Sequence, residues 1–242
     1  MQPFFDWWES VLAADPRALR IGIVGAGTGG VELALAIEHR LRKRAGGKAY
    51  GEVFLLSDSD EILPEQNALA RRWIERIIAL RGIQVHLSSS IAQVEKHCLR
   101  TASGRSLYFD HLIWATGAAA APWIGQSGLT TDERGFVMVD ATLQSVSHPR
   151  VFASGDIATQ SGTARPKAGV FAVKQGPVLT DNLRRALGGK PLRSYRPQRH
   201  ALALIGTGDR YAVAARGALA ARGAWVWRWK EKIDRDFVAR YR

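Results

Sequence analysis

The chain has 242 residues, enough for one large domain or two small domains with a buried core. Its single cysteine, Cys98, excludes an internal disulfide, a paired-thiol redox centre and a thiolate metal cluster. The formal net charge of +12 suits nucleic acid, an anionic membrane surface or a phosphorylated ligand, and composition does not choose among them. No apolar run reaches the roughly 18 to 20 residues of a membrane-spanning helix, so we expect a cytoplasmic protein.

The first half of the chain alternates between helix and strand patterns. Residues 2–19 mix aromatic, acidic and alanine positions and break at Asp15 and Pro16, which predicts a linker helix. Beyond Arg20, short β-branched runs alternate with longer runs of helical periodicity, a pattern typical of βαβ units and a parallel sheet. The expected strands are 21–24, 53–56 and 83–87, and the expected helices are 31–44 and 67–80.

The second half has a looser pattern of short elements. Three short runs separated by polar turns predict an antiparallel meander, and a buried strand follows it. The turn at 206–209 between two apolar runs predicts a hairpin. The meander runs are 91–94, 98–101 and 106–109, the further strands are 111–115, 136–139, 151–153, 201–205 and 211–215, and the helices are 169–187 and 225–241.

The segment GAGTGG fits the pattern GxGxxG directly after a strand and before a helix. Gly25 permits a tight turn, Gly27 lets a pyrophosphate approach the backbone, and Gly30 lets the helix pack closely on the strand. Thr28 and Gly29 lie at the amino end of that helix, whose partial positive charge stabilises an anion by about 0.3 to 2 kcal/mol. The alternative is a flexible turn between packed elements, but the context favours a dinucleotide site.

The residues after the second strand bear on which dinucleotide binds. An acidic residue usually stands there, because its carboxylate accepts hydrogen bonds from the adenine ribose. Ser57 takes this position and Asp58 follows it, so Asp58 would serve if the register shifts by one residue. Asp58, Asp60 and Glu61 would repel the 2′-phosphate of NADP, and the sequence therefore favours NADH over NADPH.

Three ordered motifs resemble a known family. They are GAGTGGVELALA at 25–36, DHLIWATG at 110–117 and VFASGDIA at 151–158, and they look like motifs of the flavoproteins of the pyridine nucleotide-disulfide oxidoreductase superfamily. The chain is most similar to the thiol-free branch, which includes type II NADH dehydrogenases and the flavoprotein module fused to selenophosphate synthetase. Residues 166–187 and the tail WRWKEKIDRDF resemble the same branch. The resemblance implies FAD and NAD(P)H as cofactors, with hydride passing to the flavin N5 and then to a quinone or another acceptor.

The resemblance also implies roles for residues outside the glycine loop. Asp156, after Gly155, would hydrogen-bond the ribityl chain or the phosphate side of the flavin, and the helix beginning near Lys167 would face the isoalloxazine. Thr116 and Gly117 would lie at the crossing between the two domains. A plain helix-cap aspartate is the alternative for Asp156.

Glu32 matches a family carboxylate near the nicotinamide, and a first-turn glutamate favoured by the helix dipole is the equal alternative. No general acid or base is indicated, because the flavin and the nicotinamide carry the chemistry. No pair of histidines has metal-ligand spacing, so we expect no metal site.

The expected fold is α/β: a Rossmann-like NAD(P)-binding domain, the C-terminal part of an FAD-binding domain, and a small α+β C-terminal region. In the family, a separate βαβ unit binds the ADP part of FAD, and residues 1–19 are too short for one, which needs roughly 30 residues. We therefore expect weak FAD binding or none by this chain, which would be either a fragment of a longer protein or completed by a partner chain that supplies the missing unit. The expected segments are a linker helix (1–19), the nicotinamide domain (20–118), part of the flavin domain (119–187), and a hairpin with an amphipathic helix (188–242).

The final helix has an apolar face. Val226, Trp229, Ile233 and Phe237 recur at spacings of three and four. Such a face packs on its own domain or lies on the inner face of a membrane, where tryptophans and arginines suit the headgroup region, and both interpretations stay open.

Two other classes of function compete with an oxidoreductase. One is a non-catalytic NAD(H)-binding module or subunit, which predicts nucleotide binding without turnover. The other is nucleic-acid binding through the basic surface, and no reading motif in the sequence favours it.

Overall fold

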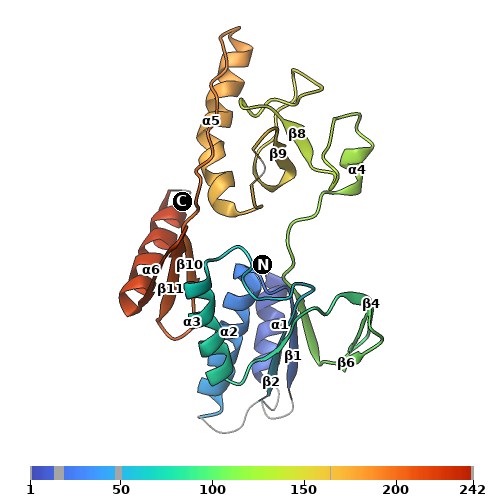
Figure 1. The fold of residues 1–242 in the computed structure, drawn as a ribbon, viewed down its shortest axis with the longest axis vertical. Coiled ribbons are helices and arrows are strands. Elements are labelled where there is room, and N and C mark those ends of the chain that lie inside the picture. Colours follow the sequence, from blue (N-terminus) through green and yellow to red (C-terminus); the bar gives the residue numbers. More distant parts are fainter. Residues whose placement is uncertain (1, 14–18, 47–50, 164, 241–242) are drawn as a thin grey trace. The chain divides into compact units, whose positions relative to one another are not determined.

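The computed structural model describes residues 2–13, 19–46, 51–163 and 165–240 (Figure 1). The expected break at Asp15 and Pro16, the end of the basic run at 40–48, and Tyr241 lie outside the described residues. The chain forms two compact units: unit 1 holds residues 1–116 and 202–242, and unit 2 holds residues 117–201. By contacts, the C-terminal hairpin and helix thus belong to the same unit as the glycine loop.

Unit 1 is built on a four-stranded parallel sheet in the order β3-β2-β1-β7. This mixed α/β arrangement with a parallel sheet confirms the expected fold class. Val24 is paired with both Leu56 and Trp114, and Leu56 is paired with His86, so the four strands end level at one edge. The strands are β1 (Arg20–Val24), β2 (Glu52–Leu56), β3 (Gln84–His86) and β7 (His111–Trp114).

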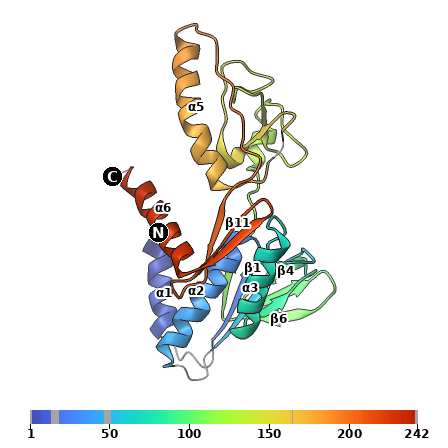
Figure 2. The same ribbon diagram turned by 60° about the vertical axis from the view of Figure 1, so that its left-hand side comes forward.

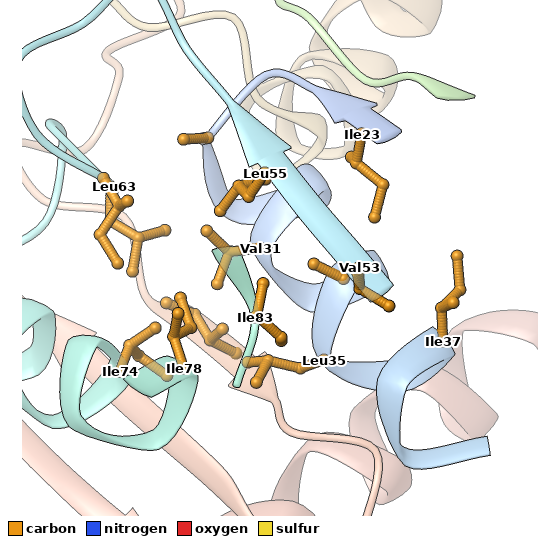
Figure 3. Packing of buried hydrophobic residues seen from close by; sticks show 14 of the residues in the cluster. Ile23, Val31, Leu35, Ile37, Val53, Leu55, Leu63, Ile74, Ile78 and Ile83 are labelled. Carbon is orange, nitrogen blue, oxygen red and sulfur yellow. The ribbon is translucent and has the colours of Figure 1, made fainter. Parts of the chain in front are cut away.

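Alternating strand residues bury both faces of this sheet. Ile23 and Leu55 join the larger core, shown in Figure 3, with residues of the helices α2 (Thr28–Arg44) and α3 (Ala68–Leu80). Their neighbours Val24 and Phe54 face a second core under the antiparallel meander. Burying each Leu, Ile or Phe side chain contributes about 1.5 to 3 kcal/mol. The meander strands are β4 (Ile91–Glu95), β5 (Cys98–Thr101) and β6 (Ser106–Tyr108).

The first helix, α1 (Gln2–Ala13), packs on the larger core of unit 1. Val11 is fully buried there, and Trp7 and Trp8 lie against the same cluster. The Trp7 indole Nε1 donates to His111 Nδ1 over 3.1 Å. The helix expected in this segment is therefore fixed to the domain that follows it.

Unit 2 consists of short elements around a small core. Its longest element is the helix α5 (Gly169–Leu187), and its strands β8 (Val137–Val139) and β9 (Ala158–Gln160) pair in parallel. Tyr195 closes the core, which also contains Ile124, Val137, Val139, Leu143 and Ala158. The remaining elements are a short helix α4 (Pro122–Gly125) and a 3-10 turn η1 (Gly155–Ile157).

The strand expected at 151–153 is wrong. Phe152 makes only an isolated antiparallel bridge to Gln144, flanked by the hydrogen bonds Ser145 N to Val151 O and Ala153 N to Leu143 O. Within the described part of the chain, no strand pairs with the other edge of this segment. Since a strand is stabilised by its ladder of hydrogen bonds, one bridge is not enough to define it. Two strands, β9 and β12, were not predicted from the sequence.

The C-terminal module, residues 202–240, lies beside α2 and α3 (Figure 2). Its three antiparallel strands place Ile205 and Val213 in the larger core of unit 1, while Val226 of the last helix packs on Ala212 and Ala214. The module consists of β10 (Ala203–Gly206), β11 (Ala212–Arg216), β12 (Leu219–Gly223) and α6 (Ala224–Ala239).

A buried ion network fastens this module to α2 and α3. Arg81, at the end of α3, donates to the carbonyl oxygen of Thr207 over 2.5 Å and pairs with Asp209 over 2.6 Å. The same guanidinium lies 3.4 Å from Glu38 of α2, whose side chain is only 1% exposed and is also paired with Arg42. A buried carboxylate is tolerated only when it is paired, so these charges depend on each other.

Replacing Arg81 tests this network. Arg81→Met leaves Glu38 partly uncompensated and the Thr207 carbonyl without its donor, so we expect the free energy of unfolding to fall by roughly 3 kcal/mol. Urea unfolding followed by tryptophan fluorescence measures the change. Arg76→Met, at an exposed position of the same helix, serves as the control and should change stability by less than about 0.5 kcal/mol. Equal stability of the two variants would contradict the assigned role of the network.

Candidate functional site

The candidate nucleotide site lies at the edge where the parallel strands of unit 1 end. The glycine loop follows β1 at this edge, and its Gly25 N–H donates to Leu56 O of β2 over 2.7 Å. On the other side, Ala115 N–H donates to Val24 O over 2.8 Å, so the end of β7 lies against the same loop. Ligands of open α/β sheets bind outside the carboxyl ends of the strands, which is where these three segments meet.

Two glycines of the loop are required by close backbone contacts. Gly25 has a φ of +115°, and a Cβ there would lie 2.4 Å from the carbonyl oxygen of Ala115. A Cβ on Gly30 would lie 1.8 Å from the carbonyl oxygen of Gly25. Both distances are far below contact, so any side chain at either position would force the backbone apart. The tight turn and the close helix packing expected from the motif are thus visible in the geometry.

The other two glycines leave open space in front of the helix. A Cβ on Gly27 or Gly29 would meet no described atom within 4 Å. Gly27 is the N-cap of α2 and supplies no side-chain cap, so the first-turn amides of the helix, beginning with Thr28, have no acceptor inside the helix. Free amides at the positive end of a helix dipole form a ready anion site. The loop therefore fits a diphosphate.

The residues after β2 differ in exposure. Ser57 is buried, and its Oγ accepts a hydrogen bond from Ser59 N–H over 3.2 Å, while Asp58 is exposed at the same sheet edge. The chain then returns to the glycine loop, because Leu63 N–H donates to Ala26 O over 2.8 Å. Of the two candidate ribose ligands, Ser57 is thus buried and Asp58 is exposed to solvent at this edge.

Glu32 lies one turn beyond the glycine loop on α2, and the C-terminal module contacts it. Its Oε1 accepts a hydrogen bond from Gly206 N–H over 3.0 Å and lies 3.3 Å from the ammonium of Lys230. Sequence reasoning missed both partners, because they are more than 170 residues away in the chain and only the tertiary fold brings them to α2. The Glu32 carboxylate therefore forms tertiary contacts in addition to any interaction with the helix dipole.

Thr116 and Gly117 mark the boundary between the two units. Unit 1 ends at Thr116, and unit 2 starts at Gly117. Thr116 follows the end of β7, and its backbone nitrogen would lie 3.0 Å from a Cβ at Gly25. Thr116 is thus part of the strand-end cluster around the glycine loop.

A second candidate site is a small cavity in unit 2, about 30 Å³ in volume. Gly155 and Asp156 lie on one side of it, and the amino end of α5 lies on the other. Gly155 has a φ of +73°, and a Cβ there would lie 3.3 Å from the Cβ of Ala172, so glycine suits both the turn and the contact. This volume admits about two water molecules, so a larger ligand would contact the rim of the cavity.

Gln175 is a site residue that the sequence analysis missed. Its side chain is buried, and its Oε1 accepts a hydrogen bond from Gly155 N–H over 2.6 Å. It also lines the cavity, and its Nε2 has no hydrogen-bond partner among the described residues. One end of the amide thus holds the turn before Asp156, and the other end is a donor for a ligand.

Lys167 turns toward the core of unit 2. Its ammonium donates to Ala158 O over 2.6 Å and to Thr159 Oγ1 over 3.0 Å, and it lies 4.0 Å from the centre of the Phe136 ring. Burial lowers the pKa of Lys167, and the nearby carboxylates of Asp132 and Asp156 offset this only in part. The side chain fixes β9, while its backbone leads into α5 beside the cavity.

Comparison with known proteins identifies the family. The model of the pyridine nucleotide-disulphide oxidoreductase family matches residues 8–176, well over half of the chain. The chain belongs to this family. The match includes the glycine loop, the strand-end cluster at Thr116 and the turn at Asp156, which were recognised from the sequence motifs.

Two of the curated relatives are named as quinone reductases or oxidoreductases. The demethylphylloquinone reductase NdbB of Synechocystis is 28% identical over 210 residues, covering 81% of this chain and 49% of the relative. The type II NADH:quinone oxidoreductase of Haemophilus influenzae is 25% identical over 193 residues, covering 75% of this chain and 43% of the relative. The chain thus spans half or less of the length of these relatives.

Solved structures share the fold. The sulfide:quinone oxidoreductase of Aquifex aeolicus matches with a TM-score of 0.75 at 14% identity, covering 96% of this chain and 60% of that protein. The CoADR-RHD protein of Bacillus anthracis matches with a TM-score of 0.64 at 20% identity, covering 90% of this chain and 37% of that protein. At these identities the likeness concerns the fold alone.

The glycine loop can be tested with two variants that differ in their local contacts. Gly27→Ala places a methyl group in open space where a pyrophosphate would lie, so the protein should keep its thermal stability and lose NADH binding by about tenfold or more. Gly30→Ala collides with the Gly25 carbonyl and should lower the melting temperature. Thermal unfolding and calorimetric titration with NADH measure both effects. Unchanged NADH affinity in a folded Gly27→Ala protein would contradict the proposed pyrophosphate position.

Proposed function

We propose that this chain is the nicotinamide-nucleotide-binding part of an FAD-dependent NAD(P)H oxidoreductase. The observation that carries the proposal is the glycine loop, with two glycines required by backbone contacts and two facing open space at a helix amino end. Gly25, Gly27, Thr28, Gly29 and Gly30 form the pyrophosphate site. The backbone amides at the amino end of α2, beginning with Thr28, bind the anion, since no side chain obstructs it, while the Gly25 amide donates to Leu56 and fixes the turn.

Residues around the loop complete the nucleotide site in this proposal. Asp58 accepts hydrogen bonds from the adenine ribose, and buried Ser57 shapes the turn that presents it. Asp60 lies nearby and Glu61 is paired with Arg71, so the carboxylates of Asp58 and Asp60 are the charges that favour NADH over the more negative NADPH. Glu32 faces the nicotinamide end of the nucleotide, and Thr116 and Gly117 border the same strand ends.

The cavity in unit 2 is proposed as part of a flavin site. Gly155, Asp156 and the backbone at Lys167 border it, and Asp156 and Gln175 offer an acceptor and a donor to the polar part of a flavin. When bound, the flavin supplies the group that accepts hydride from the nicotinamide and passes electrons onward. The protein residues orient the two ligands, and none of them acts as a general acid or base in this proposal.

The segment around Phe152 supports the proposal that unit 2 is part of a larger domain. Phe152 lies in the short apolar run 151–153, and within the described residues no strand pairs with its outer edge. Parallel strands such as β8 and β9 usually belong to larger sheets that are covered on both faces. We propose that a further βαβ unit, carrying the adenine-binding part of the FAD site, adds to this edge from a longer polypeptide or from a partner chain.

The electron acceptor in this proposal is a quinone. The relatives from Synechocystis and Haemophilus influenzae are named as a demethylphylloquinone reductase and an NADH:quinone oxidoreductase. The chain is also proposed to belong to the thiol-free branch, together with the flavoprotein module fused to selenophosphate synthetase, because Cys98 is its only cysteine. A non-catalytic NAD(H)-binding subunit is the second candidate, and the open edge of unit 2 is the observation that favours it.

An absorption experiment tests the proposal. The purified chain is incubated with excess FAD and desalted, and its visible spectrum is recorded before and after NADH is added under nitrogen. We expect little retained flavin, since in this proposal the adenine-binding part of the FAD site belongs to the further βαβ unit, together with NADH binding by calorimetry. A retained flavin band that NADH bleaches would contradict the partial site, and absence of NADH binding would contradict the nucleotide site.

The last helix supports a peripheral location at the membrane. No helix of the described residues is long and apolar enough to span a membrane. Four apolar side chains on α6 form a stripe, and each of them is between 40% and 56% exposed. Val226, on the same helix, is instead fully buried. The rings of two of them, Trp225 and Trp229, are stacked. We propose that this α6 stripe (Trp225, Trp229, Ile233 and Phe237), flanked by lysines and arginines, binds the protein to the headgroup region of a membrane.

Co-sedimentation with liposomes tests the α6 stripe. The double variant Trp229→Ser with Phe237→Ser removes exposed apolar area and should lose most of its binding to anionic vesicles at low salt, with no loss of fold stability. Leu219→Ser removes an exposed leucine on β12 and should bind as the wild type does. Wild-type protein that stays in the supernatant at low salt would rule out the membrane seat.

A further inference from the structure

Glu32 and Lys230 form a contact between the nucleotide-binding helix and the last helix of the chain. Glu32 Oε1 receives two donors from the C-terminal module, the Gly206 amide at 3.0 Å and the Lys230 ammonium at 3.3 Å. A Cβ on Gly206 would lie 2.8 Å from the same oxygen, so a side chain there would displace the carboxylate end of Glu32. The contact is built by backbone and side-chain groups together, which fixes the carboxylate in one orientation.

The second oxygen of Glu32, Oε2, has no hydrogen-bond or ion-pair partner among the described residues. Two donors on Oε1 therefore leave Oε2 as an acceptor on a half-buried side chain whose rotation is restricted. An oriented acceptor one turn after the diphosphate loop suits a donor group of the nucleotide. The nicotinamide end carries a carboxamide NH₂ group that is such a donor.

Lys230 is well placed to hold this orientation. Its side chain is 24% exposed, and it bridges Glu32 and Asp234. Burial alone would lower the pKa of Lys230, but the two carboxylates outweigh it and raise the pKa above its usual value, so the group stays charged at neutral pH. Independent contacts of the module, chiefly Arg81 with Thr207 and Asp209, keep β10 in place when Lys230 is changed.

We propose that Lys230 is a positioning residue for the nicotinamide end of the nucleotide, acting through the carboxylate of Glu32. The inference rests on the proposed nucleotide site and adds to it a residue from the C-terminal module. The last helix thereby takes part in substrate binding although it lies more than 190 residues from the glycine loop in the chain.

A binding comparison tests the role of Lys230. The dissociation constants of NADH and ADP-ribose are measured by calorimetry for the wild type and for Lys230→Met, Lys230→Arg and Lys232→Met. ADP-ribose shares the adenosine, diphosphate and ribose groups with NADH and lacks the nicotinamide. Lys232 is a matched control, because it too pairs with an aspartate four residues later on α6, and it is exposed.

We expect Lys230→Met to weaken NADH by about fivefold and to leave ADP-ribose unchanged. Lys230→Arg should restore most of the NADH affinity, and Lys232→Met should match the wild type. In a Glu32→Gln background, Lys230→Met should add no further loss, because the carboxylate that it holds is gone.

Three results would overturn the inference. Equal weakening of both ligands would show a structural role, and equal affinity of Lys230→Met and wild type would show none. A further NADH loss on adding Lys230→Met to Glu32→Gln would exclude the route through the carboxylate. Failure of the wild type to bind either ligand would instead refute the proposed nucleotide site, which separates the two proposals.

Discussion

The approach of three backbone segments at the end of the parallel sheet is the constraint on which the rest of unit 1 depends. Gly25, Gly30 and Ala115 come so close that a single methyl group would exceed the available space. This closeness lets β1 pass into α2 without a wider loop and holds β7 against the same turn. It also aims the first amides of α2 at one point, so the packing requirement and the anion site have the same origin.

The C-terminal module is the second structural feature with a functional consequence. Three of its residues complete the main core, and the charges of Glu38, Arg81 and Asp209 fix its hairpin to α2 and α3. Because the module is anchored there, its last helix can present one apolar face outward and still deliver Lys230 to Glu32. Membrane binding and nucleotide binding are thus proposed for neighbouring faces of one short helix.

Unit 2 differs from unit 1 in how completely its hydrogen bonds are used. In unit 1 even the edge strands β3 and β7 form ladders of three and four residue pairs with their neighbours, and both sheet faces are covered. In unit 2 the segment around Phe152 has an apolar strand sequence but forms only a single bridge, to Gln144. The difference explains why the strand expected from the pattern VFA is not formed, and it gives a physical basis to the proposed βαβ partner.

The sequence by itself determined the local elements of unit 1. Short apolar runs predicted β1 and β2, and the spacing of glycines before a helix predicted the turn at Gly25, because these features depend on neighbours only a few residues away. The family also followed from the sequence, since the order of three motifs can be recognised without knowledge of their contacts.

Only the tertiary structure decided which distant groups meet. Glu32 looked like a first-turn glutamate in the sequence, and its contact with Gly206 and Lys230 depends on how the C-terminal module docks. Gln175 on α5 likewise gave no signal until its amide met Gly155 across a turn. No periodic pattern in the sequence predicts hydrogen bonds and ion pairs between remote segments, because these contacts require only that two surfaces fit after folding.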